Sequence, residues 1–398
     1  MKYIKNTLKY TLATIVALLL IVNVFILVTG RTYLYKGIAN TYLKGRSGPS
    51  INESELFENR MVKVGVAQPT PHAANYNKIP LSTTQQQFAD SFGTIAFVVI
   101  KNDSLVHEQY WDGFDDKSHT NSFSMAKSIV AMLVGVAIND GKIASVDDPI
   151  TKYLPEFKAM ENSKLGTITI RHLLTMSSGV NFDEDYVNPL AYPAEAYYGD
   201  DLKKLTLQSH YKATEEPGKY FKYHSGDTQL LTFVLEAATG EHVADYASKK
   251  LWSKIGTTNE AWWNLDHKDG NEKSFCCFNS NAPDFARIGS LILHYGKWNG
   301  QQVVDSAYVV EMTSLAKLKN PKTEATITNY GFQWWLVPNY KGHNIVYMRG
   351  KQGQYVAIIR DLNLVVCRLG HQQSKLFAGE DHRADFFKFI DIALDITK

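Results

Sequence analysis

Residues 124–138 read SMAKSIVAMLVGVAI, and this stretch decides the fold that the sequence predicts. Apolar residues fall on nearly every face of a helix of this length, and Gly141 follows as a typical helix end. A helix without a polar face has to be covered on all sides, so we expect it at the centre of the protein. The stretch begins with Ser124, and Lys127 follows one turn later on the same face.

Short apolar runs lie on both sides of this stretch, towards the two ends of the chain. Residues 94–100 and 105–111, with the turn signal Asn102-Asp103 between them, predict a hairpin. Further strands are expected at 345–348, 355–359 and 364–367, and helices at 169–176, 227–239, 282–295 and 384–396. We therefore predict an α+β fold of the α/β sandwich type. Its antiparallel sheet is built from both ends of the chain, is flanked by helices and has an inserted, mainly helical region.

The composition of the 398-residue chain is that of an ordinary globular protein, with 44% hydrophobic residues and a net charge of +2. A charge so close to zero gives no support to nucleic-acid binding, which needs clustered Lys and Arg. Three cysteines cannot form a disulfide framework. A bond between the neighbours Cys276 and Cys277 would be strained, so we expect small packed residues there and assign no role to them or to Cys367.

The N-terminus carries a long uncharged apolar run at residues 11–30, with Lys2, Lys5 and Lys9 before it and Arg31 after it. About twenty residues suffice to span a bilayer as a helix. An uncleaved membrane anchor is favoured over a cleaved signal sequence because no A-x-A-like cleavage site follows, and a buried core helix is a third alternative. Both leading alternatives place the rest of the chain outside the cytoplasm, in the periplasm or outside the cell.

The organisation that we expect has four parts. Residues 1–9 form a basic N-terminus, and residues 10–30 form the transmembrane anchor or signal sequence. Residues 31–85 look like a stalk or linker, because turn-forming residues and prolines interrupt a polar stretch. Residues 86–398 form a single domain, which carries all the motifs described next.

The search for a nucleophile leaves one pattern. The sequence has no G-x-S-x-G elbow, no H-E-x-x-H and no Walker A motif. The pattern S-x-x-K occurs at 124–127, 209–212 and 314–317, but only the first opens a buried apolar helix. The helix dipole there favours a developing negative charge on Ser124, and the Lys127 amine can reach its hydroxyl. The alternative is a helix-capping serine followed by a surface lysine.

Two further sequence motifs support a catalytic interpretation of Ser124. Tyr223-His224-Ser225 resembles the Y-x-N element of serine penicillin-recognising enzymes, and residues 350–354, GKQGQ, resemble the K-T-G element at the head of an active-site strand. With the phrases at 171–179 and 283–289, the chain resembles the β-lactamase-related serine hydrolases, in the branch of class C β-lactamases, carboxylesterases and nylon-oligomer hydrolases. This resemblance implies a β-lactamase/transpeptidase-like fold.

The resemblance also implies a mechanism. Ser124 would attack an ester or amide carbonyl, and Lys127 would be its base if burial and a nearby cation, of which Lys351 is one candidate, lower its pKa. Tyr223 would move the proton to the leaving group. Backbone N–H groups of Ser124 and Gln354 would form the oxyanion hole. No metal or organic cofactor is required.

Substrate contacts follow from the same resemblance. Ser225 stands where β-lactamases carry the asparagine that helps to hold the substrate amide, so strong β-lactam turnover is not expected. Lys351 and Gly353 belong to the K-T-G-like element. Tyr186 lies in the acidic loop 183–186, which we expect over the cleft, either binding a substrate amine or, in the simpler interpretation, as a solvated loop with packed aromatic rings.

The function that we predict is hydrolysis of a small-molecule ester or amide through an acyl-enzyme on Ser124. A β-lactamase or a D-amino-acid peptidase on the same scaffold is one alternative. A non-catalytic binding or sensor module that kept the fold is an alternative of another class. The acyl group, the leaving group and the oligomeric state do not follow from the sequence.

Overall fold

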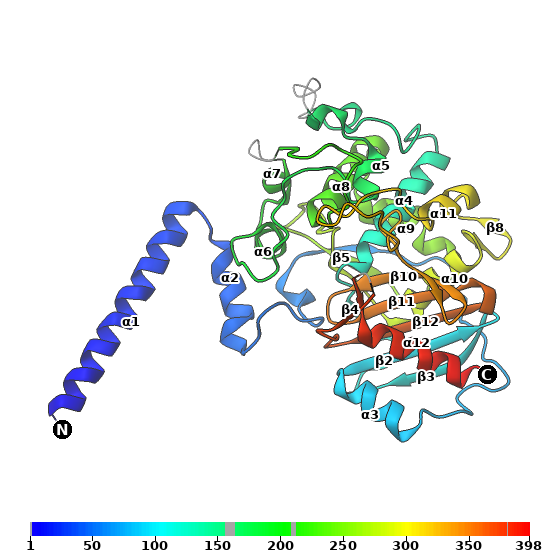
Figure 1. Cartoon of the computed structure of the whole chain (residues 1–398), viewed down its shortest axis with the longest axis horizontal. Helices are drawn as coiled ribbons and strands as arrows, with labels where there is room; N and C mark the ends of the chain where they lie inside the picture. Colours follow the sequence, from blue (N-terminus) through cyan, green and yellow to red (C-terminus); the bar gives the residue numbers. More distant parts are fainter. Residues whose placement is uncertain (1, 156–163, 208–211, 380) are drawn as a thin grey trace.

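A six-stranded antiparallel sheet forms the middle of the protein (Figure 1). The computed structural model describes residues 2–155, 164–207, 212–379 and 381–398. The strand order is β3-β2-β12-β11-β10-β9, with β2 at Thr94–Lys101, β3 at Ser104–Tyr110, β9 at Trp335–Tyr340, β10 at His343–Gly350, β11 at Gln354–Ile359 and β12 at Leu364–Gly370. Because β2 pairs with β12, the two ends of the chain build one sheet, as predicted.

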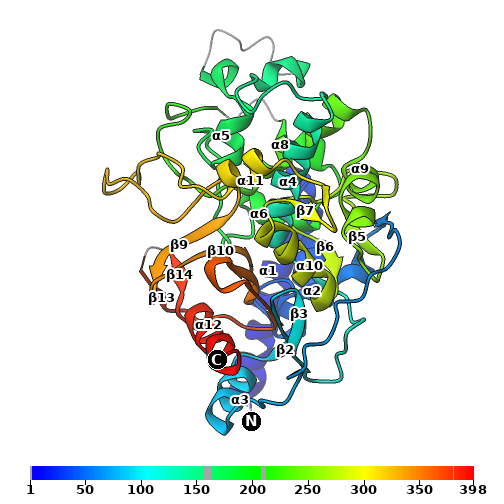
Figure 2. The same cartoon turned by 90° about the vertical axis from the view of Figure 1, so that its right-hand side faces the viewer.

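Helices cover both faces of this sheet. On one face, Phe389 of α12 (Ala384–Ile396) packs 5.9 Å from Phe97 of β2, and α3 (Thr83–Ser91) lies beside it. On the other face lies α10 (Ala282–Leu293), where Gly289 comes so close to β12 that a Cβ atom would meet Val365 at 2.5 Å. Figure 2 shows α12 and α10 on opposite sides of the strands. Successive strand residues point to opposite faces, so one apolar strand supplies both cores.

The helix predicted at the centre of the fold is α4 (Met125–Asn139), and every residue from Met125 to Ala137 is buried. It packs against β10 of the sheet and against α8 of the inserted helical region. That region contains α5 (Ile170–Leu174), α6 (Tyr192–Tyr198), α7 (Leu202–Thr206), α8 (Ser225–Thr239), α9 (Val243–Lys250) and α11 (Ser306–Met312). Of these helices, α5 and α8 were predicted from the sequence, and they agree with the prediction to within a few residues, as do α10, α12 and the predicted strands.

A second, smaller sheet was not expected from the sequence. Its order is β1-β5-β6-β4, with β1 at Asn59–Val62, β4 at Thr120–Asn121, β5 at Ala261–Asn264 and β6 at Phe278–Ser280. These strands have two to four residues, which is too short for a period of two to be visible. Two further pairs, β7 (Lys297–Trp298) with β8 (Gln301–Gln302) and β13 (Phe377–Ala378) with β14 (His382–Arg383), are shorter still.

The segment 31–85 differs from the stalk that we expected. Strand β1 pairs with β5, and helix α2 (Tyr33–Asn40) packs against α6. Five of its apolar side chains are buried, namely Tyr33, Leu34, Ile51, Phe57 and Val62. Because the residues between them are polar, the sequence pattern did not show that these five side chains are buried. The segment before residue 86 thus packs on the rest of the protein.

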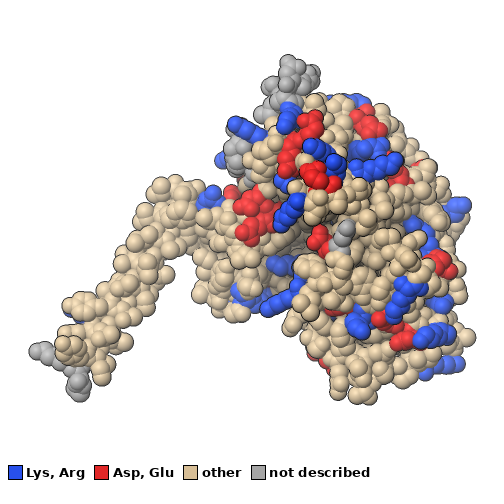
Figure 3. Space-filling view, viewed as in Figure 1, with Lys and Arg blue, Asp and Glu red and all other residues tan. Residues whose placement is uncertain are grey.

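Helix α1 (Lys2–Thr29) stands away from the body, and Figure 3 shows it free of charged side chains over most of its length. An 18-residue window within Tyr3–Thr29 has a mean hydropathy of 2.8, and the helix is long and apolar enough to cross a membrane. Its last turns meet α2, where the Tyr35 hydroxyl donates to Asn23 at 2.8 Å. The end of α1 is thus held next to the folded body of the protein.

Candidate active site

The backbone before α4 presents Ser124 at the tip of a tight turn. Phe123 has φ of +45°, a conformation that costs a non-glycine residue energy and that persists only where its surroundings enforce it. The Asn121 side chain does so here, because its Oδ1 accepts from the Phe123 N–H at 2.8 Å and from the Cys277 N–H at 3.1 Å. Ser124 then opens the helix, with its backbone N–H at the positive end of the α4 dipole.

Lys127 is buried, with 1% of its surface exposed, and its amine faces the serine. The Nζ atom lies 3.1 Å from Ser124 Oγ, 3.4 Å from Ser225 Oγ and 2.6 Å from the carbonyl oxygen of Phe275. Burial lowers the pKa of the Lys127 ammonium to about 7, although the negative charge of Glu184 acts in the opposite direction. Loss of hydration thus accounts for the low pKa, and the expected contribution of Lys351 is not part of it.

Tyr223 also lies beside Ser124. Its ring packs 5.8 Å from the Trp335 ring, and Lys127 Nζ lies 5.1 Å from the ring centroid. Burial raises the pKa of the Tyr223 hydroxyl, while a hydrogen bond with Ser124 and the charge of Arg349 oppose this shift. The phenol therefore keeps its proton at neutral pH and can donate it.

Glu184, which no sequence pattern singled out, also reaches this cluster with its carboxylate. Glu184 Oε1 accepts from the Ser225 hydroxyl at 2.5 Å and from the Tyr186 hydroxyl at 2.6 Å, and its Oε2 accepts from the Ser225 N–H at 2.8 Å. Removal from water raises its pKa, with the charge of Lys127 opposing. The acidic loop is therefore not simply a solvated face, because one of its three acids turns inwards.

Ser124 lines a cavity of about 120 Å³. Three of the predicted substrate-binding residues also line it, namely Tyr186, Ser225 and Lys351. Lys351 Nζ lies 5.7 Å from the Tyr186 ring, and burial lowers the pKa of this ammonium group. Most of the remaining wall is apolar, with side chains from α2, α6 and the segment 186–189.

Two further predicted site residues, Gly353 and Gln354, belong to the hairpin between β10 and β11 and are not among the described residues that line the cavity. The Gly353 carbonyl accepts from Arg368 Nη1 at 2.9 Å, and a Cβ atom there would lie 2.1 Å from the same nitrogen. Gln354 opens β11 opposite Gly350, and its side-chain amide donates to the carbonyl of Gly370 at 2.6 Å. Gly350 in turn lies against the Ser122 carbonyl, so this end of the hairpin reaches the turn that precedes Ser124.

Cys276 and Cys277 form a disulfide, which corrects the expectation of two small packed residues. Cys277 has φ of +66°, so the backbone here takes a conformation that sequence patterns do not reveal. Cys276 lines the cavity and directly follows Phe275, whose carbonyl holds Lys127. Cys367 is free and buried in the sheet.

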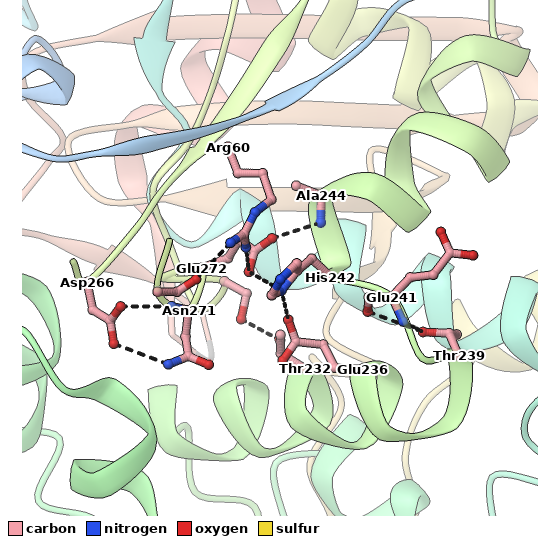
Figure 4. A network of polar contacts seen from close by, with 12 residues as sticks. Arg60, Thr232, Glu236, Thr239, Glu241, His242, Ala244, Asp266, Asn271 and Glu272 are labelled. Carbon is pink, nitrogen blue, oxygen red and sulfur yellow. Dashed lines mark hydrogen bonds and ion pairs between the residues drawn. The ribbon is translucent and has the colours of Figure 1, made fainter. Parts of the chain in front are cut away.

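One cluster outside the cavity has the composition of a metal site (Figure 4). Within the described ranges, Glu236, His242 and Glu272 are the only group of three whose candidate ligand atoms all lie within 4.8 Å of one another. Arg60 Nη1 lies 2.7 Å from Glu272 Oε2, and the Ala244 N–H donates to the same carboxylate at 3.1 Å. A cation is therefore already present, and the cluster ties α8 and α9 to β1.

The two other S-x-x-K patterns are not brought to this site. Residues 209–211 of the second pattern lie outside the described residues. In the third, Ser314 is exposed after α11 and its hydroxyl donates to the Val310 carbonyl at 2.6 Å. Among the three patterns, the described geometry shows the lysine amine on the serine hydroxyl, with that serine at a cavity, only for Ser124 and Lys127. Lys127 itself does not line the cavity.

Comparisons with known proteins agree with this geometry. A model of the family described as Beta-lactamase matches residues 81–386. The 6-aminohexanoate-dimer hydrolase of Paenarthrobacter ureafaciens is 26% identical over 268 residues, which are 63% of this chain and 66% of that protein. The chain thus spans just under two thirds of that relative's length.

Solved structures show the same architecture. A Bacillus anthracis structure assigned as a 6-aminohexanoate-dimer hydrolase superposes with a TM-score of 0.70 at 21% identity, over 87% of this chain and 92% of that chain. A family VIII carboxylesterase gives a TM-score of 0.61 at 17% identity, over 83% of this chain and 99% of that chain. At such identities the likeness concerns the fold, and it confirms the predicted one.

Proposed function

Because the chain belongs to the Beta-lactamase family and is thus a serine hydrolase, we propose that Ser124 is its nucleophile and that it cleaves a small ester or amide. The observation that carries this proposal is the distance of 3.1 Å between Lys127 Nζ and Ser124 Oγ. The lysine is buried, and its pKa of about 7 leaves a large neutral fraction at physiological pH. A neutral amine at hydrogen-bonding distance is the base that a serine hydroxyl needs.

In the first half-reaction, Lys127 accepts the hydroxyl proton as Ser124 Oγ forms a bond to the substrate carbonyl carbon. The tetrahedral oxyanion is stabilised by the Ser124 N–H at the start of α4 and by a second N–H at the β10–β11 hairpin, which we assign to Gln354. Tyr223 donates its proton to the leaving group and regains one from Lys127. The bond to the leaving group then breaks, and the acyl group remains on Ser124.

In the second half-reaction, water replaces the leaving group. Tyr223 and Lys127 remove its proton as it attacks the acyl carbon, and the same proton returns to Ser124 Oγ when the acid departs. No step of this cycle needs a metal or an organic cofactor. Ser225 and Glu184 keep the Lys127 amine in place, since Ser225 Oγ lies 3.4 Å from Nζ and is hydrogen-bonded to Glu184.

The substrate class that we propose is an ester or a linear amide. The name of the Paenarthrobacter relative describes hydrolysis of an aminohexanoate dimer, which supports an amide. Ser225 occupies the position of the asparagine that the resemblance associates with β-lactam substrates, and its hydroxyl is engaged by Glu184. This arrangement disfavours β-lactams relative to esters and linear amides.

We also propose that α1 anchors the protein in a membrane, with the catalytic body outside the cytoplasm. The support is the length and apolarity of α1 and its exposure along nearly all of its length. The catalytic body would begin at α2, since residues 33–62 pack onto it, rather than at residue 86.

The test is the intact mass of the full chain in detergent after reaction with a small alkyl fluorophosphonate and, separately, with a penicillin. We expect a phosphonyl adduct that is absent from Ser124→Ala, and no lasting penicilloyl adduct. No phosphonyl adduct on the wild-type chain would contradict the assignment of Ser124. A stable penicilloyl adduct on Ser124 would instead favour a peptidase of the penicillin-binding type.

A further inference from the structure

The segment that follows α1 forms one wall of the active-site cavity. Helix α2 contributes Leu34, Gly37 and Ile38 to this wall, and the chain after it contributes Gly48 and Pro49. We call the residues of the segment 33–49 that line the cavity the juxtamembrane wall. Because the wall belongs to the part of the chain that leaves α1, the cavity lies next to the end of the apolar helix.

Polar contacts fix the juxtamembrane wall at both of its ends. Near its start, Arg31 pairs with Glu195 of α6 at 3.5 Å, and the Tyr33 hydroxyl donates to the Pro189 carbonyl at 3.1 Å. Near its end, Gln352 Nε2 donates to the Pro49 carbonyl at 2.7 Å. Between these points, Gly37 packs so closely on the Tyr198 ring that a Cβ atom would lie 3.3 Å from it. The wall is thus a fixed part of the site.

The cavity between this wall and Ser124 is apolar. Opposite α2 it is closed by rings and aliphatic groups of Phe123, Pro189, Ala194, Tyr197 and Phe275. Of the described residues that line it, only Lys351 carries a charge, and its amine lies beside the Tyr186 ring and Gly48. Hydroxyl and amide groups also line the cavity, among them Thr41, Ser47 and Asn188, but most of its wall surface is apolar. An aliphatic chain would therefore gain from burial there.

We propose that this cavity is the acyl-binding pocket and that the physiological substrates carry an aliphatic acyl group of several carbons. The inference rests on the proposed function of Ser124. It is the acyl group that stays attached to Ser124 through both half-reactions, so a pocket closed on several sides suits it. The leaving alcohol or amine has to depart after the first half-reaction, and it needs an open path to solvent.

The experiment measures kcat/KM of the full chain in phosphatidylcholine vesicles with p-nitrophenyl acetate, butyrate and hexanoate. Each buried methylene is expected to raise kcat/KM about fourfold until the pocket is full. Ile38→Trp, which fills the pocket from α2, should lower the value for the hexanoate tenfold or more and leave that for the acetate within about threefold. Ile38→Ala should move the optimum to a longer chain.

The matched control is Ala39→Trp, because Ala39 is exposed on the same helix and does not line the cavity. We expect its chain-length profile to equal that of the wild type. A flat profile in the wild type, or an equal loss of acetate and hexanoate activity in Ile38→Trp, would overturn the inference. Labelling of Ser124 by methyl fluorophosphonate distinguishes failure of the proposed function from failure of the acyl-pocket inference. If Ser124 is not labelled, the proposed function is wrong. If Ser124 is labelled but the chain-length profile is flat, only the acyl-pocket inference is wrong.

The same acyl group could enter from water or from the lipid surface, and one further measurement distinguishes these sources. At a fixed total amount of hexanoate ester, added vesicles lower the aqueous concentration. A rate that falls in proportion shows entry from water, and a rate that is maintained shows entry from the bilayer. Each result supports the acyl pocket, provided that Ile38→Trp lowers that rate and Ala39→Trp does not.

Discussion

Two lysines of this protein are buried to the same degree and differ in what they contact. Lys127 and Lys273 have 1% and 0% of their surface exposed, and burial lowers the pKa of each to about 7. Lys127 faces the hydroxyls of Ser124 and Ser225 at the edge of a cavity. Lys273 donates to the carbonyls of Ala196 and Gly199, at 3.1 and 2.9 Å, at the end of α6.

The comparison teaches that a perturbed pKa identifies a buried amine and not a catalyst. Both lysines are available as neutral bases at pH 7, but only Lys127 has a hydroxyl within reach and a space where a substrate carbonyl can lie. The carbonyl partners of Lys273 offer no proton. We therefore expect Lys127 to determine the rate and Lys273 to affect stability alone.

The largest difference should appear when each lysine is replaced by methionine. Lys127→Met removes the base, and we expect the rate of Ser124 phosphonylation and ester hydrolysis to fall by about 10²- to 10⁴-fold. In Lys273→Met, the rates of Ser124 phosphonylation and of ester hydrolysis should both stay within about threefold of the wild-type rates. Circular dichroism spectra like that of the wild type would exclude unfolding. An active Lys127→Met would refute the role of this lysine as the base.

Removal of the Tyr223 hydroxyl should have the next largest effect. Tyr223→Phe keeps the ring on Trp335 but removes the proton donor for the leaving group, so we expect kcat to fall about 10²-fold. Substrates with a good leaving group, such as p-nitrophenol, should be less affected than alkyl esters, because they need less protonation. Tyr220→Phe is the control, since the Tyr220 hydroxyl binds Glu324 on the surface. Equal losses for both leaving groups would contradict this role.

The two lysines should act alike on stability. The pKa of each is about 7 in the folded state and about 10.4 in the unfolded chain, so between these values the unfolded chain binds more protons. The free energy of unfolding therefore rises with pH from about 7 to 10, by about 1.4 kcal/mol per pH unit for each lysine. Urea titrations of Lys273→Met at several pH values in this range give the free energy of unfolding at each pH. Its rise per pH unit should be smaller than in the wild type by that amount. An unchanged slope would mean that Lys273 titrates near its ordinary pKa.

The smallest expected change concerns the pH profile of the reaction. The rate of Ser124 phosphonylation should rise through pH 7, because only the neutral Lys127 amine accepts a proton. Glu184 raises the pKa of this amine, so Glu184→Gln should move the midpoint to lower pH. Asp185→Asn, a neighbour on the same loop, should leave the midpoint in place. A midpoint that moves to higher pH in Glu184→Gln would contradict this account of the charge balance.

The sequence predicted the large sheet and the approach of the Lys127 amine to Ser124 because long regular elements carry both. Strands of six to eight residues and a 15-residue apolar helix have visible periods, and Ser124 and Lys127 are neighbours on one helix. Glu184 was missed because three acids lie within one loop, and only the fold determines which of them faces Ser225. The smaller sheet and the juxtamembrane wall were missed because a few scattered apolar residues fix them.

The pairing of β2 with β12 has a consequence for the order of events during synthesis. The second strand of the chain and the last long strand are hydrogen-bonded neighbours, so the middle of the sheet is incomplete until nearly all residues have been made. Contacts between such distant segments form slowly. Meanwhile α1 leaves the ribosome first and, if it enters a membrane, holds the unfinished chain at the bilayer. Ser124 and Lys127 are neighbours on one helix, but the β10–β11 hairpin that we propose for the oxyanion hole reaches the start of α4 late. We therefore expect the chain to stay unreactive until its C-terminal strands have joined the sheet.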